Sequence, residues 1–253
     1  MSFKKQLILL ALITGFNYSC DKSTSDEFEE VNGHVETRLL SAISVVSAQD
    51  SYENSNVLFL YDGENKLTTV TKDNDTGIFS YDNGELANVT SGGGNLSIEE
   101  LYQSPYDAFE YGEVMEYDDN GNPYILKFIE ERYNYMSGNM EPYYYTAQVT
   151  YDDKPNLFYK TMEAGGLIDV MDGVRLNFSI APQSQDIVKA KALFFNNNPS
   201  QIIYKNEEGE VEYVVNISYV YDGDYPTSAT VTSAYTDGGE TNTYTVSFSY
   251  RSN

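Results

Sequence analysis

Four pairs of adjacent acidic residues are the best candidates for chemistry in this sequence. Two carboxylates hydrolyse a glycosidic bond when they stand about 5–9.5 Å apart across a sugar. The chain has 39 acidic residues, so neighbouring carboxylates are expected without a cleft between them. We therefore predict that the chain is not an enzyme and has no catalytic residues, with a carboxylate-dependent glycan hydrolase as the alternative. The pairs are Glu99-Glu100, Asp118-Asp119, Glu130-Glu131 and Asp152-Asp153.

Histidine and cysteine chemistry is limited because the chain has one residue of each, His34 and Cys20. A Ser-His-Asp triad needs a histidine beside its nucleophile, and an H-E-x-x-H zinc site needs two histidines. His34 falls in a polar stretch near the amino terminus, where we expect it to be exposed. The sequence also contains no G-x-x-x-x-G-K-S/T phosphate loop. We predict no metal centre and no cofactor.

Calcium is the alternative to that prediction. Asp118, Asn120 and Asn122 alternate as oxygen ligands do in calcium-binding loops, but Pro123 follows where such a loop needs glycine. No glutamate stands at the twelfth position. A hairpin turn therefore accounts for this segment better than a calcium loop.

A Tyr-Asp pair followed by glycine or asparagine recurs along the chain. Tyrosine packs on a strand face, aspartate accepts hydrogen bonds from the amides ahead of it, and glycine or asparagine takes the left-handed position of a tight turn. We predict that these residues have a structural role in hairpins. The copies are Tyr61-Asp62, Tyr81-Asp82, Tyr117-Asp118, Tyr151-Asp152 and Tyr221-Asp222.

The segments that must position these turns alternate between apolar and polar residues. Residues 143–151, 213–221 and 244–250 place tyrosine, valine and phenylalanine on one face and threonine or serine on the other. Residues 38–46 fit a helix or a strand, and we favour a strand. The predicted fold class is all-β: a mostly antiparallel meander of hairpins forming a large twisted sheet or an open sandwich, with few short helices.

Residues 37–253 are predicted to form a single domain with an irregular insertion at 155–199. The insertion contains Pro155, Gly165-Gly166, Pro182 and Pro199, and a short helix is expected near Leu167–Met171. Long irregular segments either cover a core or carry a functional surface, and we favour the covering role. Gly92-Gly93-Gly94 predicts a loop, with one helical turn near residues 98–101.

The amino terminus resembles a bacterial lipoprotein signal peptide. Lys4 and Lys5 precede an apolar run over residues 6–16 that is too short to span a bilayer, and Ser19-Cys20 ends it. Residues 1–19 are then the signal peptide, Cys20 carries the lipid, and residues 20–36 form a flexible tether. An ordinary secretory signal is the alternative. Acidic residues soon after the cysteine favour display on the outer cell surface.

The net charge of −24 limits the partners. Removal of residues 1–19 with Lys4 and Lys5 takes it to −26. Such a chain repels phosphate backbones, so nucleic acid is excluded. The 24 tyrosines and 12 phenylalanines are expected to pack on sheet faces, where a tyrosine ring is buried while its hydroxyl stays hydrated.

Longer motifs resemble known families. Tyr-Asp followed by glycine and leucine is similar to the YD repeats of RHS-type and teneurin-type shells, although their arginine after glycine is absent here. A closer likeness is to Bacteroidetes-type outer-membrane lipoproteins with a β-hairpin domain of unknown function. That likeness implies a tethered hairpin sheet in the cell envelope and brings no catalytic residues. It rests on the signal peptide and on residues 151–156, 198–202 and 224–227.

The expected function is therefore a lipid-anchored protein of the bacterial cell envelope, held at the outer membrane and facing the periplasm or the exterior. We expect a non-enzymatic binding or accessory module whose tyrosine-rich sheet face contacts a protein or a glycan. A purely structural envelope protein is a second alternative to the hydrolase. The sequence does not identify ligand-binding residues.

Overall fold

The computed structural model describes residues 22–91, 94–97, 112–173, 190–239 and 241–251. Cys20, Glu99, Glu100 and the helical turn expected near residues 98–101 lie outside these ranges. Within them, no helix has the length and apolar character that a bilayer crossing requires.

The strands of the described residues form one antiparallel sheet of 13 strands in the order β6-β5-β4-β3-β2-β1-β13-β12-β11-β10-β9-β8-β7. The predicted all-β class is confirmed. Of the two predicted arrangements, the structure shows the single large sheet and not the open sandwich. The strands that come first and last in the sequence, β1 and β13, pair with each other at the centre of the sheet, with Ile43 opposite Phe248. The strands are β1 Leu40–Ser47, β2 Ser55–Tyr61, β3 Leu67–Lys72, β4 Asp75–Asp82, β5 Glu85–Ser91, β6 Gly94–Ser97, β7 Gly112–Tyr117, β8 Pro123–Asn134, β9 Asn139–Pro155, β10 Asn197–Lys205, β11 Val211–Asp222, β12 Tyr225–Tyr235 and β13 Thr241–Tyr250.

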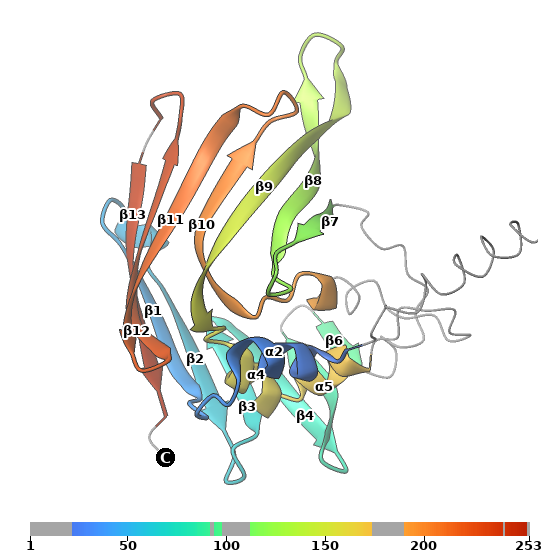
Figure 1. The fold of residues 1–253 in the computed structure, drawn as a ribbon, viewed down its shortest axis with the longest axis vertical. Coiled ribbons are helices and arrows are strands. Elements are labelled where there is room, and N and C mark those ends of the chain that lie inside the picture. Colours follow the sequence, from blue (N-terminus) through green and yellow to red (C-terminus); the bar gives the residue numbers. More distant parts are fainter. Residues whose placement is uncertain (1–21, 92–93, 98–111, 174–189, 240, 252–253) are drawn as a thin grey trace, which may run out of the picture.

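The sheet is strongly curved, and short helices lie inside the curve near one end of the strands (Figure 1). They are α2 Thr24–Asn32, α4 Tyr159–Ala164 and α5 Leu167–Asp172; a 3-10 turn, η1 Ser51–Glu53, joins β1 to β2. The strand favoured for residues 38–46 is β1, and α5 coincides with the helix expected near Leu167–Met171.

The Tyr-Asp motifs coincide with the irregularities that help to curve the sheet. All five of their tyrosines stand next to a shift in strand register. The pairs are Tyr61 opposite Leu67, Tyr81 opposite Leu86, Tyr117 opposite Pro123, Tyr151 opposite Pro199 and Tyr221 opposite Pro226. A bulge inserts an extra residue into one strand and increases the local twist. Because the same irregularity recurs from hairpin to hairpin, the twist accumulates across the sheet.

The hairpin between β4 and β5 shows why asparagine and glycine follow the motif. Asp82 pairs with Glu85, so the connection is the two residues Asn83 and Gly84. Their φ angles are 50° and 93°. Two consecutive left-handed residues are typical of the type I′ turn, whose twist matches that of the flanking strands.

The predicted tether over residues 20–36 is wrong for its described part. Ser23 caps α2 by accepting a hydrogen bond from the amide of Asp26, and the helix ends at Gly33, whose φ is 65°. Phe28 is 2% exposed and stacks on Tyr159 with ring centroids 3.5 Å apart. One buried phenylalanine in an acidic segment leaves little sequence periodicity, which is why the segment resembles a linker.

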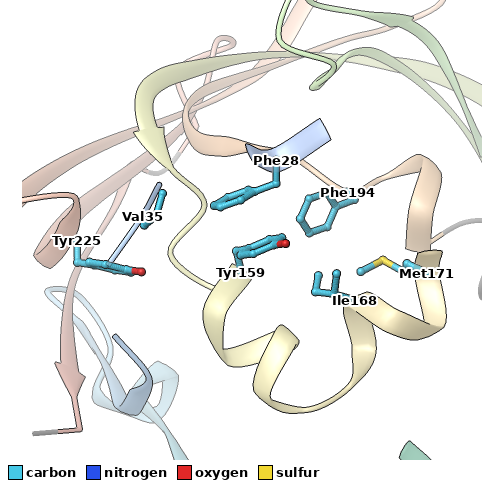
Figure 2. Packing of buried hydrophobic residues seen from close by; sticks show 7 residues of the cluster. All are labelled: Phe28, Val35, Tyr159, Ile168, Met171, Phe194 and Tyr225. Carbon is cyan, nitrogen blue, oxygen red and sulfur yellow. The ribbon is translucent and has the colours of Figure 1, made fainter. Parts of the chain in front are cut away.

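The main core cluster lies between the helices rather than in the sheet (Figure 2). It draws on α2, on the described part of the 155–199 insertion and on the strand β12. Its members are Phe28, Val35, Tyr159, Ile168, Met171, Phe194 and Tyr225. A second cluster joins Leu157 to Leu40 and Ile43 of β1, so the insertion covers the central strands.

The helices are also fixed to the sheet by close contacts. Thr161 accepts a hydrogen bond from the buried amide of Leu40, at 3.0 Å. A Cβ added to Gly165 would lie 3.3 Å from Leu67, and one added to Gly166 would lie 3.0 Å from Leu86. Glycine at these positions therefore lets the connection between α4 and α5 approach the strands β3 and β5.

Candidate binding surface on the concave face

Tyrosine hydroxyls fix the helix-covered end of the sheet. Five tyrosines near strand ends each donate a hydrogen bond to a backbone carbonyl close to the start of a neighbouring strand, at 2.6–3.1 Å. We call this set the tyrosine ladder. It pairs Tyr61 with Leu40, Tyr81 with Leu67, Tyr151 with Pro123, Tyr219 with Pro199 and Tyr250 with Pro226.

Burial makes the ladder hydroxyls hard to ionise. It raises the pKa of Tyr81 to about 12 and raises the pKa of Tyr151, Tyr219 and Tyr250 further. Neutral tyrosines at these positions hold strand ends together, and they are not poised for proton transfer near neutral pH. Tyr219 and Tyr250 have the same role without being followed by aspartate, so the Tyr-Asp motif alone does not identify the ladder.

The aspartates of the motif differ from one another. Asp62 accepts from the amides of Glu64 and Lys66, at 2.8 and 2.9 Å. Asp118 accepts in the same way from the amides two and four residues ahead. Asp222 instead forms an ion pair with Arg38 at 2.9 Å.

Asp152 joins two of the motifs through its side chain. Its carboxylate accepts a short hydrogen bond from the hydroxyl of Tyr221 and another from the amide of Lys154 at 3.0 Å. Burial raises the pKa of Asp152, and burial together with this carboxylate raises the pKa of Tyr221. Asn198 donates to the same tyrosine hydroxyl at 3.2 Å. The contact joins β9, β10 and β11 near the covered end.

A buried asparagine, Asn122, occupies the segment considered for calcium. The side-chain oxygen of Asn122, which is 0% exposed, accepts from the amides of Asn196 and Asn197 at 2.6 and 3.1 Å. Its side-chain nitrogen donates to Asp118 at 2.9 Å. The oxygens of Asp118 and Asn122 are thus engaged within the protein. The described part of the chain contains no group of three or more His, Cys, Asp or Glu that could hold a metal ion.

The remaining chemical candidates are dispersed. Of the acidic pairs, Asp118 is held in a turn, and Asp119, Asp153 and Glu131 are exposed. Asp152 lies within the strand β9, so the hairpin turn predicted at Tyr151-Asp152 is wrong. His34 is exposed as well. The feature that the structure does bring together is aromatic.

A row of aromatic rings crosses five neighbouring strands at the end of the sheet away from the helices. Successive ring centroids are 5.1, 6.3, 5.9 and 4.7 Å apart. We call this set the aromatic row. Its members, from β8 to β12, are Phe128, Tyr145, Tyr204, Tyr213 and Tyr235.

Strand alternation places the aromatic row on the concave face. Tyr213 and Tyr219 are an even number of residues apart on β11, and their register with β12 is continuous between them. Tyr219 packs against the cluster that contains Leu157 of the insertion, so both rings point to the helix side. The upper parts of β8 to β11 extend past the helices (Figure 1). Most rings of the row are half-buried, and Tyr235 is exposed.

Two charged residues, Arg132 and Glu212, contact Tyr143 beside the row. The guanidinium of Arg132 stacks 3.7 Å from the ring centre of Tyr143, and the hydroxyl of Tyr143 donates to Glu212 at 2.9 Å. Tyr143 also lies close to Tyr145 of the row, with centroids 6.3 Å apart. The surface thus combines broad aromatic contact with a few oriented polar groups.

The other half of the concave face contains a shallow hollow of about 710 Å³. Val70, Phe79 and Val89 form its apolar wall, and Lys72 and Asp75 lie at its border. Val70 pairs with Phe59, which packs against the cluster of Leu40, Ile43 and Leu157, so the hollow opens on the same face as the aromatic row. This face can bind a ligand by apolar and aromatic contact.

The sequence anticipated part of this surface. Alternation in the sequence predicted that Tyr143 and Tyr145 share one face of a strand and that Tyr213 lies on a second strand. The register between strands, which brings these rings beside Tyr204 and Phe128, follows from tertiary pairing. No local pattern distinguishes these rings from tyrosines on the opposite face.

No protein-family model matches the chain, and no curated protein matches its sequence. Among solved structures it is similar to a porin-like protein from Bacteroides uniformis ATCC 8492, with 13% identity, coverage of 84% of this chain and 98% of that chain, and a TM-score of 0.38. It is also similar to a porin-like protein from Bacteroides vulgatus ATCC 8482, with 11% identity, coverage of 85% of this chain and 100% of that chain, and a TM-score of 0.39. A third similar structure is a putative outer membrane lipoprotein-sorting protein domain from Vibrio parahaemolyticus. Its identity is 9%, the match covers 90% of this chain and 91% of that chain, and the TM-score is 0.26. At these values the similarity assigns neither a ligand nor an activity to this chain.

Proposed function

We propose that the protein is a non-enzymatic binding module of the bacterial cell envelope, anchored by lipid on Cys20, which holds a protein or glycan partner on its concave face. The aromatic row carries this proposal. Five rings in a line, supported by a stiff sheet, offer a large contact area whose side chains lose little conformational freedom on binding.

The charge of the chain narrows the partner. A net charge of −24 repels polyanions, so the ligand is expected to be neutral or cationic. Tyrosine is suited to such contacts because its ring packs against an apolar surface while its hydroxyl forms hydrogen bonds. Arg132 and Glu212, beside Tyr143, supply oriented polar groups at one side of the row.

The location is proposed from the amino terminus. The positive residues, the short apolar run and the single cysteine fit lipid attachment followed by retention at the outer membrane. Because α2 is part of the folded domain, the tether between Cys20 and the domain is shorter than the sequence alone indicates. In cells, Cys20→Ala is expected to abolish palmitate labelling and release the protein from the membrane fraction. Persistent labelling of this variant would refute the anchor.

Glycan arrays and crosslinking in envelope membranes test the ligand. Tyr204→Ala and Tyr213→Ala are expected to weaken binding at least about tenfold, since aromatic anchors commonly contribute about 2 kcal/mol in binding surfaces. Tyr144→Ala is the matched control, because Tyr144 lies on β9 next to Tyr145 and points to the opposite face. Equal loss in all three variants, or no ligand in either assay, would refute binding at the aromatic row.

A further inference from the structure

The β8–β9 hairpin reaches beyond its neighbours at the end of the sheet opposite the helices (Figure 1). Asn134 and Asn139 form the last residue pair between β8 and β9, and Gly138 takes a φ of 72° in the turn. We call residues 133–140 the hairpin tip.

Large apolar side chains of the hairpin tip are exposed to solvent. Tyr135 is 91% exposed and Met136 is 99% exposed, and Tyr133 and Met140 are about half-exposed. Tyr133 and Met140 face each other across the hairpin. Tyr133 also packs edge-on against Tyr135, with centroids 5.1 Å apart. Clustered exposure of this kind marks an interaction surface, whereas single exposed apolar residues are ordinary.

The polar groups of the tip are largely satisfied within it. The side-chain oxygen of Asn134 accepts from the amide of Met136 at 2.8 Å, and the carbonyl of Asn134 accepts from the amide of Gly138 at 2.8 Å. Glu141 accepts from the side chains of Asn134 and Ser137 at 2.7 and 2.6 Å. These bonds hold the turn in one conformation and reduce the number of donors that a partner would have to satisfy.

Charge indicates which partner suits the tip. Residues 133–140 contain no Asp, Glu, Lys, Arg or His in a chain of net charge −24. Tyrosine favours the headgroup level of a bilayer, where its ring is in an apolar layer and its hydroxyl in water. Residues 133–140 carry no charge, and their hydrogen bonds are made among themselves and to Glu141 at the base of the tip. An apolar apex of this kind avoids the main costs of entering that layer, provided that Glu141 stays in water.

We propose that the hairpin tip inserts into the interface of a zwitterionic lipid bilayer. Met136 and Tyr135 enter the layer first, because they are the most exposed, and Tyr133 and Met140 follow. The insertion is independent of the ligand on the concave face.

The absence of tryptophan from the chain makes a direct test available. The full chain with Cys20→Ser, which carries no lipid, is prepared with Tyr135→Trp and mixed with phosphatidylcholine vesicles. The tryptophan emission is expected to shift to shorter wavelength and to be quenched by brominated lipid. Tyr52→Trp is the control, since Tyr52 is 95% exposed on η1 and the uncleaved leader affects both variants equally.

Further outcomes decide the proposal. Met136→Asp in the Tyr135→Trp background is expected to reduce the quenching by brominated lipid about tenfold, because a carboxylate is costly inside the bilayer. Phosphatidylglycerol is expected to weaken insertion, because the acidic chain is repelled. Emission at position 135 that matches the Tyr52→Trp control would overturn the proposal. So would a photocrosslinker at position 136 that captures one envelope protein while position 135 stays in water, since the tip would then be a protein contact.

Discussion

Replacement of Phe28 by alanine tests whether the segment after the cysteine belongs to the fold. The ring is 2% exposed and stacks on Tyr159 in a cluster with Ile168 and Phe194. Truncating a buried phenylalanine costs about 3–5 kcal/mol, through lost apolar burial and the cavity that remains. With an m-value of about 3 kcal/mol per molar urea for a domain of this size, the unfolding midpoint should fall by about 1–2 M.

Far-UV circular dichroism in urea measures this midpoint without a tryptophan. Glu29→Ala is the matched control, because Glu29 is the next residue of α2 and is exposed. Surface substitutions of that kind change the free energy of unfolding by no more than about 0.5 kcal/mol. If residues 20–36 were a tether, both variants would unfold at the wild-type urea concentration. Equal midpoints for Phe28→Ala and Glu29→Ala would therefore refute the packing of α2 described above.

Three further changes probe the turns and the covered end of the sheet. Asn122→Ala should cost about 2–5 kcal/mol in urea unfolding, because it leaves two buried backbone amides without an acceptor; an unchanged midpoint would contradict the network. Gly166→Ala should lower stability by about 1–3 kcal/mol, because φ is 74° and the added Cβ would lie 3.0 Å from a side-chain carbon of β5. Gly63→Ala, with nothing within 4 Å, should be near neutral, and equal melting temperatures for the two variants would count against this contact. Burial raises the pKa of Tyr81 and Tyr225 to about 12, above about 10 for unfolded tyrosine, so their contribution to stability is complete below about pH 10 and is lost as pH rises through about 12. Spectrophotometric titration should show delayed tyrosinate formation that accompanies unfolding, and complete ionisation near about pH 10 in the folded state would refute it.

The sequence by itself determined the local architecture. Alternation between apolar and polar residues identified strands, and Asn-Gly or Asp-Gly turns identified hairpins, because both signals depend on neighbours in the chain. Asn83 and Gly84 illustrate this, since their left-handed angles are a local requirement. The chain likewise has one histidine, so this sequence cannot form an H-E-x-x-H zinc motif, which needs two.

Tertiary structure decided where these hairpins meet. The pairing of β1 with β13 joins the two ends of the domain, and no local signal specifies it, because the edges of many alternating strands are equivalent until the core is buried. The same limit applies to Phe28, whose partner Tyr159 is remote in sequence, and to the aromatic row, whose rings become neighbours through register alone. The Tyr-Asp pairs show both contributions. Local chemistry sets the tight turns after Asp62 and Asp118, while the carbonyls that Tyr61, Tyr81 and Tyr151 reach are set by the neighbouring strands.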